Sequence, residues 1–405
     1  MKCRNCNSGS IIKTVSLGEQ YLTGIFPKDI NQKITKGPLD LIFCNTCNLL
    51  QLGKSYDLDE MYGDNYGYRS GLNQSMVNHL EKKINHLEHL VQPKTNDLVI
   101  DIGSNDATSL KAYKGNFEKV GIDPTGEKFT KFYTDNIKLI PDFFSYKVFN
   151  EKYPNKKAKI LTSIAMFYDL EDPNSFVNDI YKCLDDDGIW HFEQSYMPSM
   201  LRTNAYDTIC HEHLEFYSLT VVKNILEVNN LKIIDVQMNA INGGSFAITA
   251  TKTSCKKFKI NKPIIEWLLN QESRMKLDTP TPYIDFGKRI EQHREDLRLL
   301  ILKLNQAGKK VFGYGASTKG NVLLQYCGFT SKEIPFIAEV NSEKFGSYTP
   351  GTNIPIISES EAKKMKPDYF LVLPWHFRDF ILNKETEFIN SGGKLIFPLP
   401  EIEIY

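Results

Sequence analysis

The chain has 405 residues, of which 41% are hydrophobic and 24% are charged. This is the composition of an ordinary folded protein, which excludes a disordered or collagen-like chain, and the length predicts two or three domains. Lysine plus arginine equals aspartate plus glutamate at 49 each, so net charge provides no attraction to nucleic acid or to an anionic membrane. Because neither a long apolar run nor an apolar segment near Met1 is present, we expect a cytoplasmic protein.

Two Cys-x-x-Cys pairs stand in the first fifty residues, Cys3 with Cys6 and Cys44 with Cys47. This spacing turns two thiolates toward one ion, and four thiolates are a common ligand set for tetrahedral zinc. A redox pair or two unrelated pairs of thiols are the alternatives. No histidine precedes His79, so we predict a closed site that holds one structural Zn²⁺.

Residues 1 to about 65 have few long apolar stretches, so we expect a few strands between Ile11 and Phe43 and a core that depends on the metal. A helical spacing of apolar residues covers 66–89. Buried strands are then predicted at 97–101, 119–123, 158–163 and 188–192, with a helix at 175–184. Strands at 231–239 and 244–252 lie close enough in sequence to form an antiparallel pair. This alternation indicates a parallel α/β sheet.

Prolines interrupt two helical stretches between residues 256 and 305, and a second α/β unit follows Gly308. Its strands are expected to begin near Lys310, Ile334, Tyr369 and Lys394. We therefore predict an α/β protein in which a zinc-binding N-terminal module, residues 1–65, precedes two doubly wound Rossmann-like domains in tandem. These domains cover 66–255 and 256–405.

The first strand of the 66–255 domain ends in a turn that suits a nucleoside ligand. It reads Asp101-Ile-Gly103-Ser104-Asn105, and Asp123 ends the next strand. Backbone amides in such a turn face a ligand, and the second acidic residue can bind ribose hydroxyls. A dinucleotide would need glycine at Asn105. S-adenosylmethionine carries no phosphate, and its amino group would lie near Asp101, so the pattern favours that donor over a dinucleotide; a purely structural turn is the other reading.

A second glycine-rich turn, residues 313–321, opens the C-terminal sheet. It matches neither the dinucleotide pattern, because Thr318 holds the third glycine position, nor a phosphate loop, because Lys319 precedes Gly320. Small residues and a lysine at the start of a helix can still bind an anion such as a diphosphate. A tight packing turn is the alternative.

Glu193, Gln194 and Tyr196 follow the fourth strand directly, at the sheet edge where open α/β folds build sites, and the same stretch continues to residues 206–217. The segment is rich in titratable side chains, and we expect few of its positions to be buried. Glu212 stands between His211 and His213 and can orient one of them as a general base. The histidines lack the i, i+4 spacing of a zinc protease helix. A solvated polar loop is the alternative.

Motifs along nearly the whole chain resemble those of the three-domain sugar C-methyltransferases, which methylate a nucleotide-linked 4-keto-deoxysugar at the carbon beside the ketone. The matching segments are 3–6, 44–52, 66–71, 101–106, 210–213, 242–245, 313–321 and 348–355. The resemblance implies a zinc-binding domain, a central S-adenosylmethionine domain, and a C-terminal Rossmann-like domain that helps to hold a nucleotide-diphosphate sugar. It leaves the oligomeric state open, with a monomer plausible.

The same resemblance assigns residues to roles. The donor would bind Gly103, Ser104, Asn105 and Asp123. His213 would be the base, Glu212 would orient or tune His213 and His211, and Tyr68 would meet the substrate; all four count as catalytic candidates. The remaining candidates for substrate binding are Tyr66, Arg69, Tyr168, Cys210, Lys319 and Asn321.

The chain departs from the family pattern at three places. Cys210 replaces a tyrosine, and residues 164–169 carry no histidine, where Tyr168 is the candidate replacement. Ala107 replaces a glycine, which we expect to matter little because the helix has begun there. These departures keep open O-methylation of a hydroxyl, a nucleotide-sugar-binding protein without catalysis, and a dehydrogenase that uses the C-terminal turn.

Overall fold

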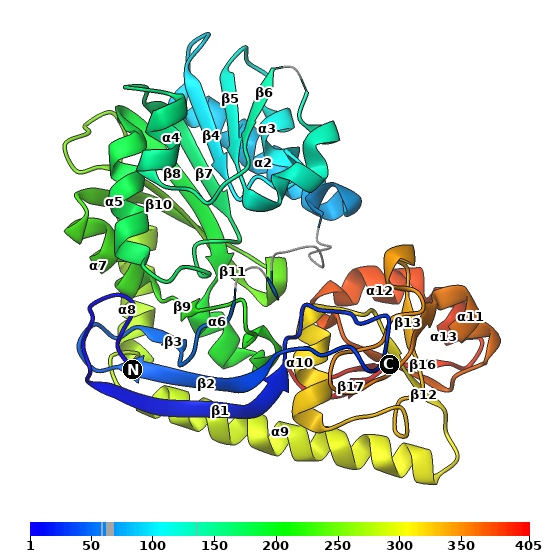
Figure 1. Cartoon of the computed structure of the whole chain (residues 1–405). Coiled ribbons are helices and arrows are strands. Elements are labelled where there is room, and N and C mark those ends of the chain that lie inside the picture. The colour runs from blue at the N-terminus through cyan, green and yellow to red at the C-terminus, as the bar shows by residue number, and fades with distance from the viewer. Residues whose placement is uncertain (58–59, 62–68, 135) are drawn as a thin grey trace.

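The computed structural model describes residues 1–57, 60–61, 69–134 and 136–405. Tyr66 and Tyr68, two of the candidates for substrate contact, lie outside the described residues, as does the predicted boundary at residue 65. Three sheets of four, seven and six strands form within the described part of the chain (Figure 1). No helix in this part is both long enough and apolar enough to cross a membrane.

The N-terminal sheet is antiparallel and has the order β1-β2-β3-β9. Its strands are β1 (Ile11–Tyr21), β2 (Lys36–Cys44), β3 (Leu50–Leu52) and β9 (Glu215–Phe216). Alternate residues of β2 share one face, and Leu39, Leu41 and Phe43 are completely buried there. Phe43 packs against Tyr283, at 5.1 Å between ring centroids. The strands of this module therefore bury an apolar face in addition to the cysteine cluster, which the sequence did not indicate.

The central sheet has the order β10-β11-β8-β7-β4-β5-β6. Its strands are β4 (Leu98–Ile102), β5 (Glu118–Ile122), β6 (Ile137–Ile140), β7 (Ala158–Ile164), β8 (Leu184–Ser195), β10 (Leu231–Asn239) and β11 (Ser245–Lys252). The strands from β6 to β8 pair in parallel, whereas β11 is antiparallel to both of its neighbours. The predicted strands are present, and β6 is an addition that the sequence reading missed.

Helices cover both faces of the central sheet. They are α2 (Gln74–Val91), α3 (Thr108–Ala112), α4 (Tyr146–Lys152), α5 (Pro173–Cys183) and α7 (Leu219–Val228). A further short helix, α6 (Met197–Arg202), instead buries its apolar side chains in the cluster shared with the N-terminal module. Side chains alternate along each strand. Val99, Ile160 and Ile189 accordingly join Ile84 and Leu87 of α2 in one apolar cluster. A second cluster on the other face holds the following residues: Ile100, Leu161, Trp190, Val177 and Ile180.

The C-terminal sheet has the order β14-β13-β12-β15-β16-β17, parallel except for its last pair. Its elements are β12 (Val311–Tyr314), α10 (Thr318–Cys327), β13 (Ile337–Glu339), β14 (Ile356–Ser358), α11 (Glu359–Lys364), β15 (Tyr369–Val372), α12 (Arg378–Lys384), α13 (Thr386–Asn390), β16 (Lys394–Phe397) and β17 (Glu403–Ile404). The predicted α/β class, with a cysteine module followed by two Rossmann-like units, is confirmed.

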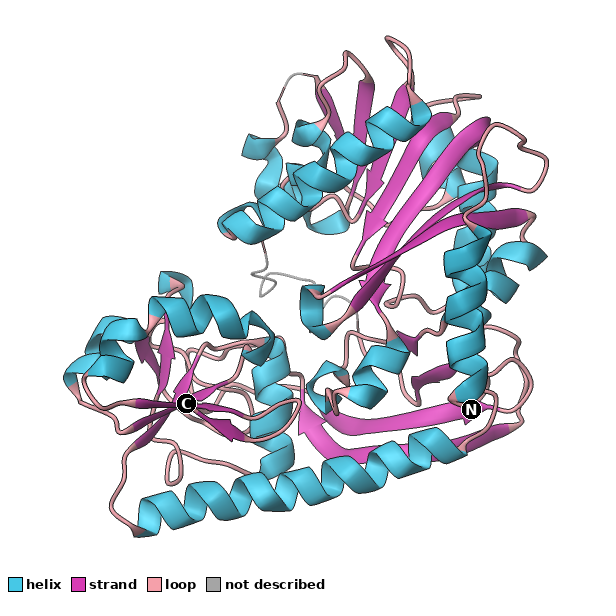
Figure 2. Cartoon of the chain, turned by 180° about the vertical axis from the view of Figure 1, so that it is seen from behind, coloured by secondary structure: helices cyan, strands magenta, loops and turns pink. Residues whose placement is uncertain are grey.

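Two helices connect the sheets, α8 (Lys262–Arg274) and α9 (Thr281–Gln306). The long helix α9 runs along β1 and then reaches the C-terminal sheet (Figures 1 and 2). At the end of α8 the buried Glu272 accepts hydrogen bonds from the backbone amides of Leu219 (2.5 Å) and Thr220 (2.8 Å) and from the Tyr196 hydroxyl (2.7 Å). One carboxylate thus caps α7 and fixes the connection to the C-terminal unit.

Replacing Glu272 by alanine should destabilise the protein by roughly 2–4 kcal/mol, because it leaves two backbone amides and the hydroxyls of Tyr196 and Thr220 without an acceptor. Urea unfolding followed by circular dichroism measures this loss. Glu266→Ala, at an exposed position of the same helix, is the matched control and should change the midpoint little. Equal midpoints for the two variants would show that the cap contributes nothing.

Candidate functional site

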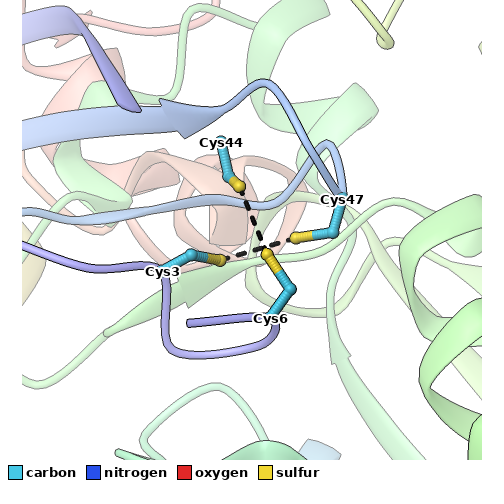
Figure 3. A group of neighbouring side chains, drawn as sticks. All are labelled: Cys3, Cys6, Cys44 and Cys47. Carbon is cyan, nitrogen blue, oxygen red and sulfur yellow. Dashed lines mark hydrogen bonds between the residues drawn. The ribbon is translucent and has the colours of Figure 1, made fainter. Parts of the chain in front are cut away.

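The four cysteines of the two Cys-x-x-Cys pairs come together in the N-terminal module (Figure 3). Their sulfur atoms all lie within 4.8 Å of one another, a separation that suits four ligands of one zinc ion with Zn–S bonds of about 2.3 Å. The two turns are built alike, since the amide of Asn7 donates to the Cys3 carbonyl and that of Asn48 to the Cys44 carbonyl, both at 2.9 Å. Both asparagines adopt the left-handed conformation, with φ of 57° and 63°.

The thiols pair across the cluster, with 3.4 Å between the sulfurs of Cys3 and Cys47 and 3.6 Å between those of Cys6 and Cys44. The hydrogen bond from Cys47 lowers the pKa of Cys3 to about 5. The same hydrogen bond raises the pKa of Cys47, so the pair favours one thiolate, and thiolate is the form that binds zinc. The chemistry and the spacing of the donor set both fit a zinc ion.

The turn after β4 is shaped for a ligand at the carboxyl end of the central sheet. Gly103 has a φ of +70°, and a Cβ there would lie 3.3 Å from the Met166 side chain. Asp101 is buried, which raises its pKa to about 7, and it accepts a hydrogen bond of 2.5 Å from Thr162. The Ser104 hydroxyl lies 2.8 Å from the Tyr133 hydroxyl. These contacts hold the backbone of the turn close to the adjoining cavity.

Asp123 organises this turn from the next strand. Its Oδ2 accepts a hydrogen bond of 2.7 Å from the Asn105 amide, and its Oδ1 accepts from the amide and the hydroxyl of Thr125, each at 2.7 Å. Three of roughly four lone-pair positions of the carboxylate are thereby used. Asp123 thus fixes the separation of the two strand ends between which a nucleoside would lie.

Ala107 is a correction to the sequence reading. The helix α3 begins at Thr108, one residue later than expected, and Ala107 has a φ of 60°. This is the left-handed conformation, which glycine adopts freely and which costs alanine about 1–2 kcal/mol. The replacement of glycine is therefore a source of strain in the turn.

A cavity of about 500 Å³ joins the donor turn to the segment that follows β8. On one side it is lined by Asp101, Gly103, Ser104, Asn105, Asp123, Phe143 and Phe144, and on the other by Tyr168, Cys210, Glu212, His213, Thr318 and Lys319. The central sheet contributes the first set, whereas the second comes from the loops after β7 and β8 and from the start of α10. The predicted donor residues thus share one space with five of the eight predicted acceptor-side residues that the structure describes.

His213 is held in one orientation within this cavity. Its Nδ1 lies 2.8 Å from the carbonyl oxygen of Thr208. Because a carbonyl only accepts, Nδ1 carries the proton and Nε2 keeps its lone pair. The Tyr168 ring packs against the imidazole at 4.4 Å between centroids. Burial and the cation of Lys319 lower the pKa of His213 to about 4, so the imidazole is neutral near pH 7 and able to accept a proton.

The segment 206–217 is not a solvated loop. Most of its residues are buried, His211 and Tyr206 completely, which contradicts the expectation that few of its positions would be. The segment lies at the junction of the three sheets, where β9 pairs with β3 and Trp375 of the C-terminal unit donates to Asp207 at 2.8 Å.

Among the candidate catalytic and substrate-binding residues that the structure describes, three do not line the cavity. His211 packs edge-on against Tyr56, at 4.6 Å between ring centroids, on the side of the N-terminal module. Asn321 is buried and donates to the Thr23 carbonyl at 2.8 Å. Arg69 forms an ion pair of 3.5 Å with Asp106, next to the donor turn. All three hold elements together around the site.

Cys210 and Glu212 both face the cavity, and burial raises the pKa of each. A Cβ at Gly24 of the N-terminal module would collide with Oε1 of Glu212. The glycine therefore leaves room for the carboxyl group. A buried carboxyl with a raised pKa tends to keep its proton, and it can then act as a hydrogen-bond donor.

The stretch that begins at Glu193 was expected near a site, and Glu193 and Gln194 both line the cavity, although the sequence assigned neither of them a role. Glu193 accepts from His79 (2.6 Å) and Asn239 (2.7 Å) and pairs with Lys83 (2.6 Å). The rule that sites lie at the carboxyl ends of parallel strands pointed to this strand. The residues of this network lie far apart in the sequence, so their contacts could not be inferred from it.

Comparison with known families and proteins matches each part of the chain. Residues 3–62 match a family described as "Putative zinc binding domain", residues 76–236 a "Methyltransferase domain", and residues 240–400 a "C-methyltransferase C-terminal domain". The C-methyltransferase NovU of Streptomyces niveus is 30% identical over 404 residues, which cover 99% of this chain and 96% of that protein.

Among solved structures, an S-adenosylmethionine-dependent methyltransferase from Clostridium acetobutylicum is 10% identical with a TM-score of 0.35, over 44% of this chain and 92% of that one. Magnesium protoporphyrin IX methyltransferase from Synechocystis, solved with SAH, is also 10% identical with a TM-score of 0.33, over 44% of this chain and 88% of that one.

We expect the purified protein to contain one zinc ion per chain, and Cys44→Ser to contain none, because three thiolates bind zinc far less tightly than four. The variant should also melt about 5 °C or more below the wild type. Elemental analysis and a thermal scan measure the two effects. Cys255→Ser, outside the cluster, should keep its metal; a metal-free wild type that melts normally would contradict a structural zinc.

Proposed function

The chain belongs to the C-methyltransferase family that combines a zinc-binding, a methyltransferase and a C-terminal domain, and from this premise we propose that it methylates a ring carbon next to the ketone of a nucleotide-linked 4-keto sugar. The protein is a methyltransferase dependent on S-adenosylmethionine. One observation carries the proposal of a carbon acceptor: the donor turn and the lone pair of a fixed, neutral histidine share one cavity.

The residues around the donor turn fit S-adenosylmethionine. That donor supplies a methyl group on a positively charged sulfur, which a carbon nucleophile can attack. Gly103, Ser104 and Asn105 would lie against it, and Phe143 and Phe144 add apolar surface. Asp123 would reach the ribose with its remaining lone pair while it holds the Asn105 amide. We assign Asp101 to the amino end of the donor, as its position at the start of the turn suggests.

His213 would act as the general base. A hydrogen on the carbon beside a ketone moves as a proton to Nε2, and the electron pair of the C–H bond passes into the enolate. The Thr208 carbonyl, which accepts from Nδ1, stabilises the imidazolium that results. The enolate carbon is then the nucleophile that the sulfonium methyl group requires.

The charge that develops on the ketone oxygen needs a hydrogen-bond donor. Burial favours the protonated form of Glu212, which lines the same cavity and can donate to that oxygen. We assign Lys319 to the diphosphate of the substrate, because this lysine enters the cavity from the first turn of α10. Tyr168 and Cys210 complete the wall beside His213. The roles of Tyr66 and Tyr68 remain predictions.

O-methylation is the second candidate, and the composition of the cavity supports it. A hydroxyl acceptor needs one general base and no stabilised enolate, and Cys210 offers a weaker hydrogen-bond donor than the tyrosine of the family pattern. The two reactions differ in their product, since a methyl group on carbon and one on oxygen have distinct NMR shifts. We also propose a cytoplasmic location, where the four zinc-binding thiols stay reduced.

Wild-type protein in D₂O should exchange the hydrogen beside the ketone of a 4-keto-6-deoxyhexose linked to dTDP, UDP or GDP, without any methyl donor, because proton removal precedes methyl transfer. His213→Ala should abolish this exchange and lower the methylation rate by about 10²–10⁴-fold. Proton NMR follows both reactions. His89→Ala, at an exposed position, should behave like the wild type, and methylation by a wild type that never exchanges would refute the carbon mechanism.

Lys319→Met should move the acid limb of kcat/KM to higher pH. The base acts only when neutral, so activity is lost as pH falls through the pKa of His213, which lies at about 4 in the wild type. Removing the lysine cation removes one cause of that low pKa. The midpoint of the acid limb should therefore move toward pH 6.5, which is about the pKa of an ordinary histidine. Rate profiles from pH 4 to 8 measure it, with exposed Lys303→Met as the control. A wild-type limb already near 6.5 would contradict the assignment.

A further inference from the structure

Arg4 lies between two zinc-binding cysteines, yet its guanidinium reaches away from the metal site. Nη1 donates to the Leu52 carbonyl at 2.6 Å and Nη2 to the Ser55 hydroxyl at 2.8 Å. Nε donates at 3.1 Å to Glu171, which lines the substrate cavity. The side chain is 10% exposed. One buried arginine therefore links the first cysteine turn to the end of β3 and to the loop after β7.

Glu215 lies behind this arginine with a side chain that has no exposed surface, and its Oε1 is 3.9 Å from Nε of Arg4. Within the described part of the chain, Arg4 is the cation that forms an ion pair with Glu215. The other oxygen, Oε2, accepts from the Leu170 amide at 3.3 Å. Burial raises the pKa of Glu215 well above its usual range, and the cation of Arg4 lowers it. Loss of the arginine therefore removes a charge that favours the ionised carboxylate at a place that water cannot reach.

Glu215 is tied to the residues around His213 through a short chain of contacts. The amides of Leu214 and Glu215 both donate to the Tyr168 carbonyl, at 2.8 and 3.0 Å. The ring of Tyr168 packs on the imidazole of His213. The Leu52 amide donates to the Leu214 carbonyl at 2.8 Å. The N-terminal module is thus hydrogen-bonded to the residue that directly follows His213.

We propose that Arg4 is a positioning residue for the reaction. By balancing the charge of Glu215 it holds residues 168–171 and 214–216 together, and thereby holds Tyr168 against His213. The cysteine module would then help to position His213, the proposed base, in addition to stabilising its own fold. The effect on catalysis rests on the proposed role of His213, whereas the effect on the two segments does not.

A local role for Arg4, limited to closing the cysteine module, makes a different prediction. If Arg4 acts through the charge of Glu215, neutralising that carboxylate should remove most of the need for the arginine. If Arg4 acts only on its own module, the effects of the two substitutions should add, because they would be independent.

The experiment compares Arg4→Met, Glu215→Gln and the double variant in the full-length protein. Arg4→Met should keep its zinc, lose hydrogen-exchange protection at residues 168–171 and 214–216, and remove the proton of a dTDP-linked 4-keto-6-deoxyhexose about 10–100-fold more slowly, since small misplacements of reacting groups cost rates of this order. The double variant should exchange at the rate of Glu215→Gln, and Arg4→Lys should retain most of the wild-type rate.

Lys13→Met is the matched control, because it breaks an exposed ion pair with Asp40 in the same module and should change none of these quantities. Additive losses in the double variant, loss of zinc from Arg4→Met, or unchanged protection of the two segments would each overturn the proposal. A wild type that exchanges no 4-keto sugar nucleotide would instead refute the proposed function, while the protection data would still decide the role of Arg4.

Discussion

The burial of residues 206–217 at the meeting point of three sheets is the constraint on which the site depends. Burying a segment this rich in charge costs free energy wherever a polar group lacks a partner, and most of the cost must be offset by the contacts that do form. The buried Tyr217 hydroxyl, for example, has no hydrogen bond in the described structure. The partners come from all three units: Trp375 for Asp207, Arg4 for Glu215, and the segment's own Thr208 carbonyl for His213. Consequently no single unit could build the cavity wall.

This arrangement also sets the protonation states in the cavity. Low polarity disfavours charge on each titratable group, so it lowers the pKa of His213 and raises those of Asp101 and Glu212. The histidine is thus a neutral acceptor of protons, and the glutamate tends toward a neutral donor. A cavity that held both groups charged would need water, which would compete with the substrate for the same hydrogen bonds.

Much of the fold could be predicted because its signals are local. The strand at Leu98–Ile102 is a short apolar run that ends at Gly103, and the cysteine spacing brings four thiols together wherever the chain allows it. The donor turn was predicted for the same reason, since Gly103 and Asp123 follow strands, whereas the choice of His213 over His211 came from the family resemblance.

What could not be predicted depends on long-range contacts. Nothing near Arg4 in the sequence points to Glu215, and nothing near Glu193 points to His79 and Lys83. His211 and Asn321 carry suitable chemistry, but packing against the N-terminal module turns them away from the cavity.

In both Rossmann-like units a carboxylate at the end of the second strand accepts a hydrogen bond from a backbone amide of the first turn. The units differ in the side chains that lie beside that turn. Asp123 accepts from the Asn105 amide, and Glu339 accepts from the Ala316 amide, both at 2.7 Å. In the C-terminal unit, however, Lys344 donates to the Ala316 carbonyl at 2.7 Å, and a Cβ on Gly315 would meet Pro374 at 2.7 Å.

The chain's own side chains therefore occupy the place that a nucleoside would take in the C-terminal turn. The large cavity touches α10 only at Thr318 and Lys319. A dehydrogenase would need an open turn at that point, so the packing there argues against one. The contribution of the C-terminal unit to the cavity is therefore Lys319 and its neighbour Thr318, whereas the central sheet supplies the donor side.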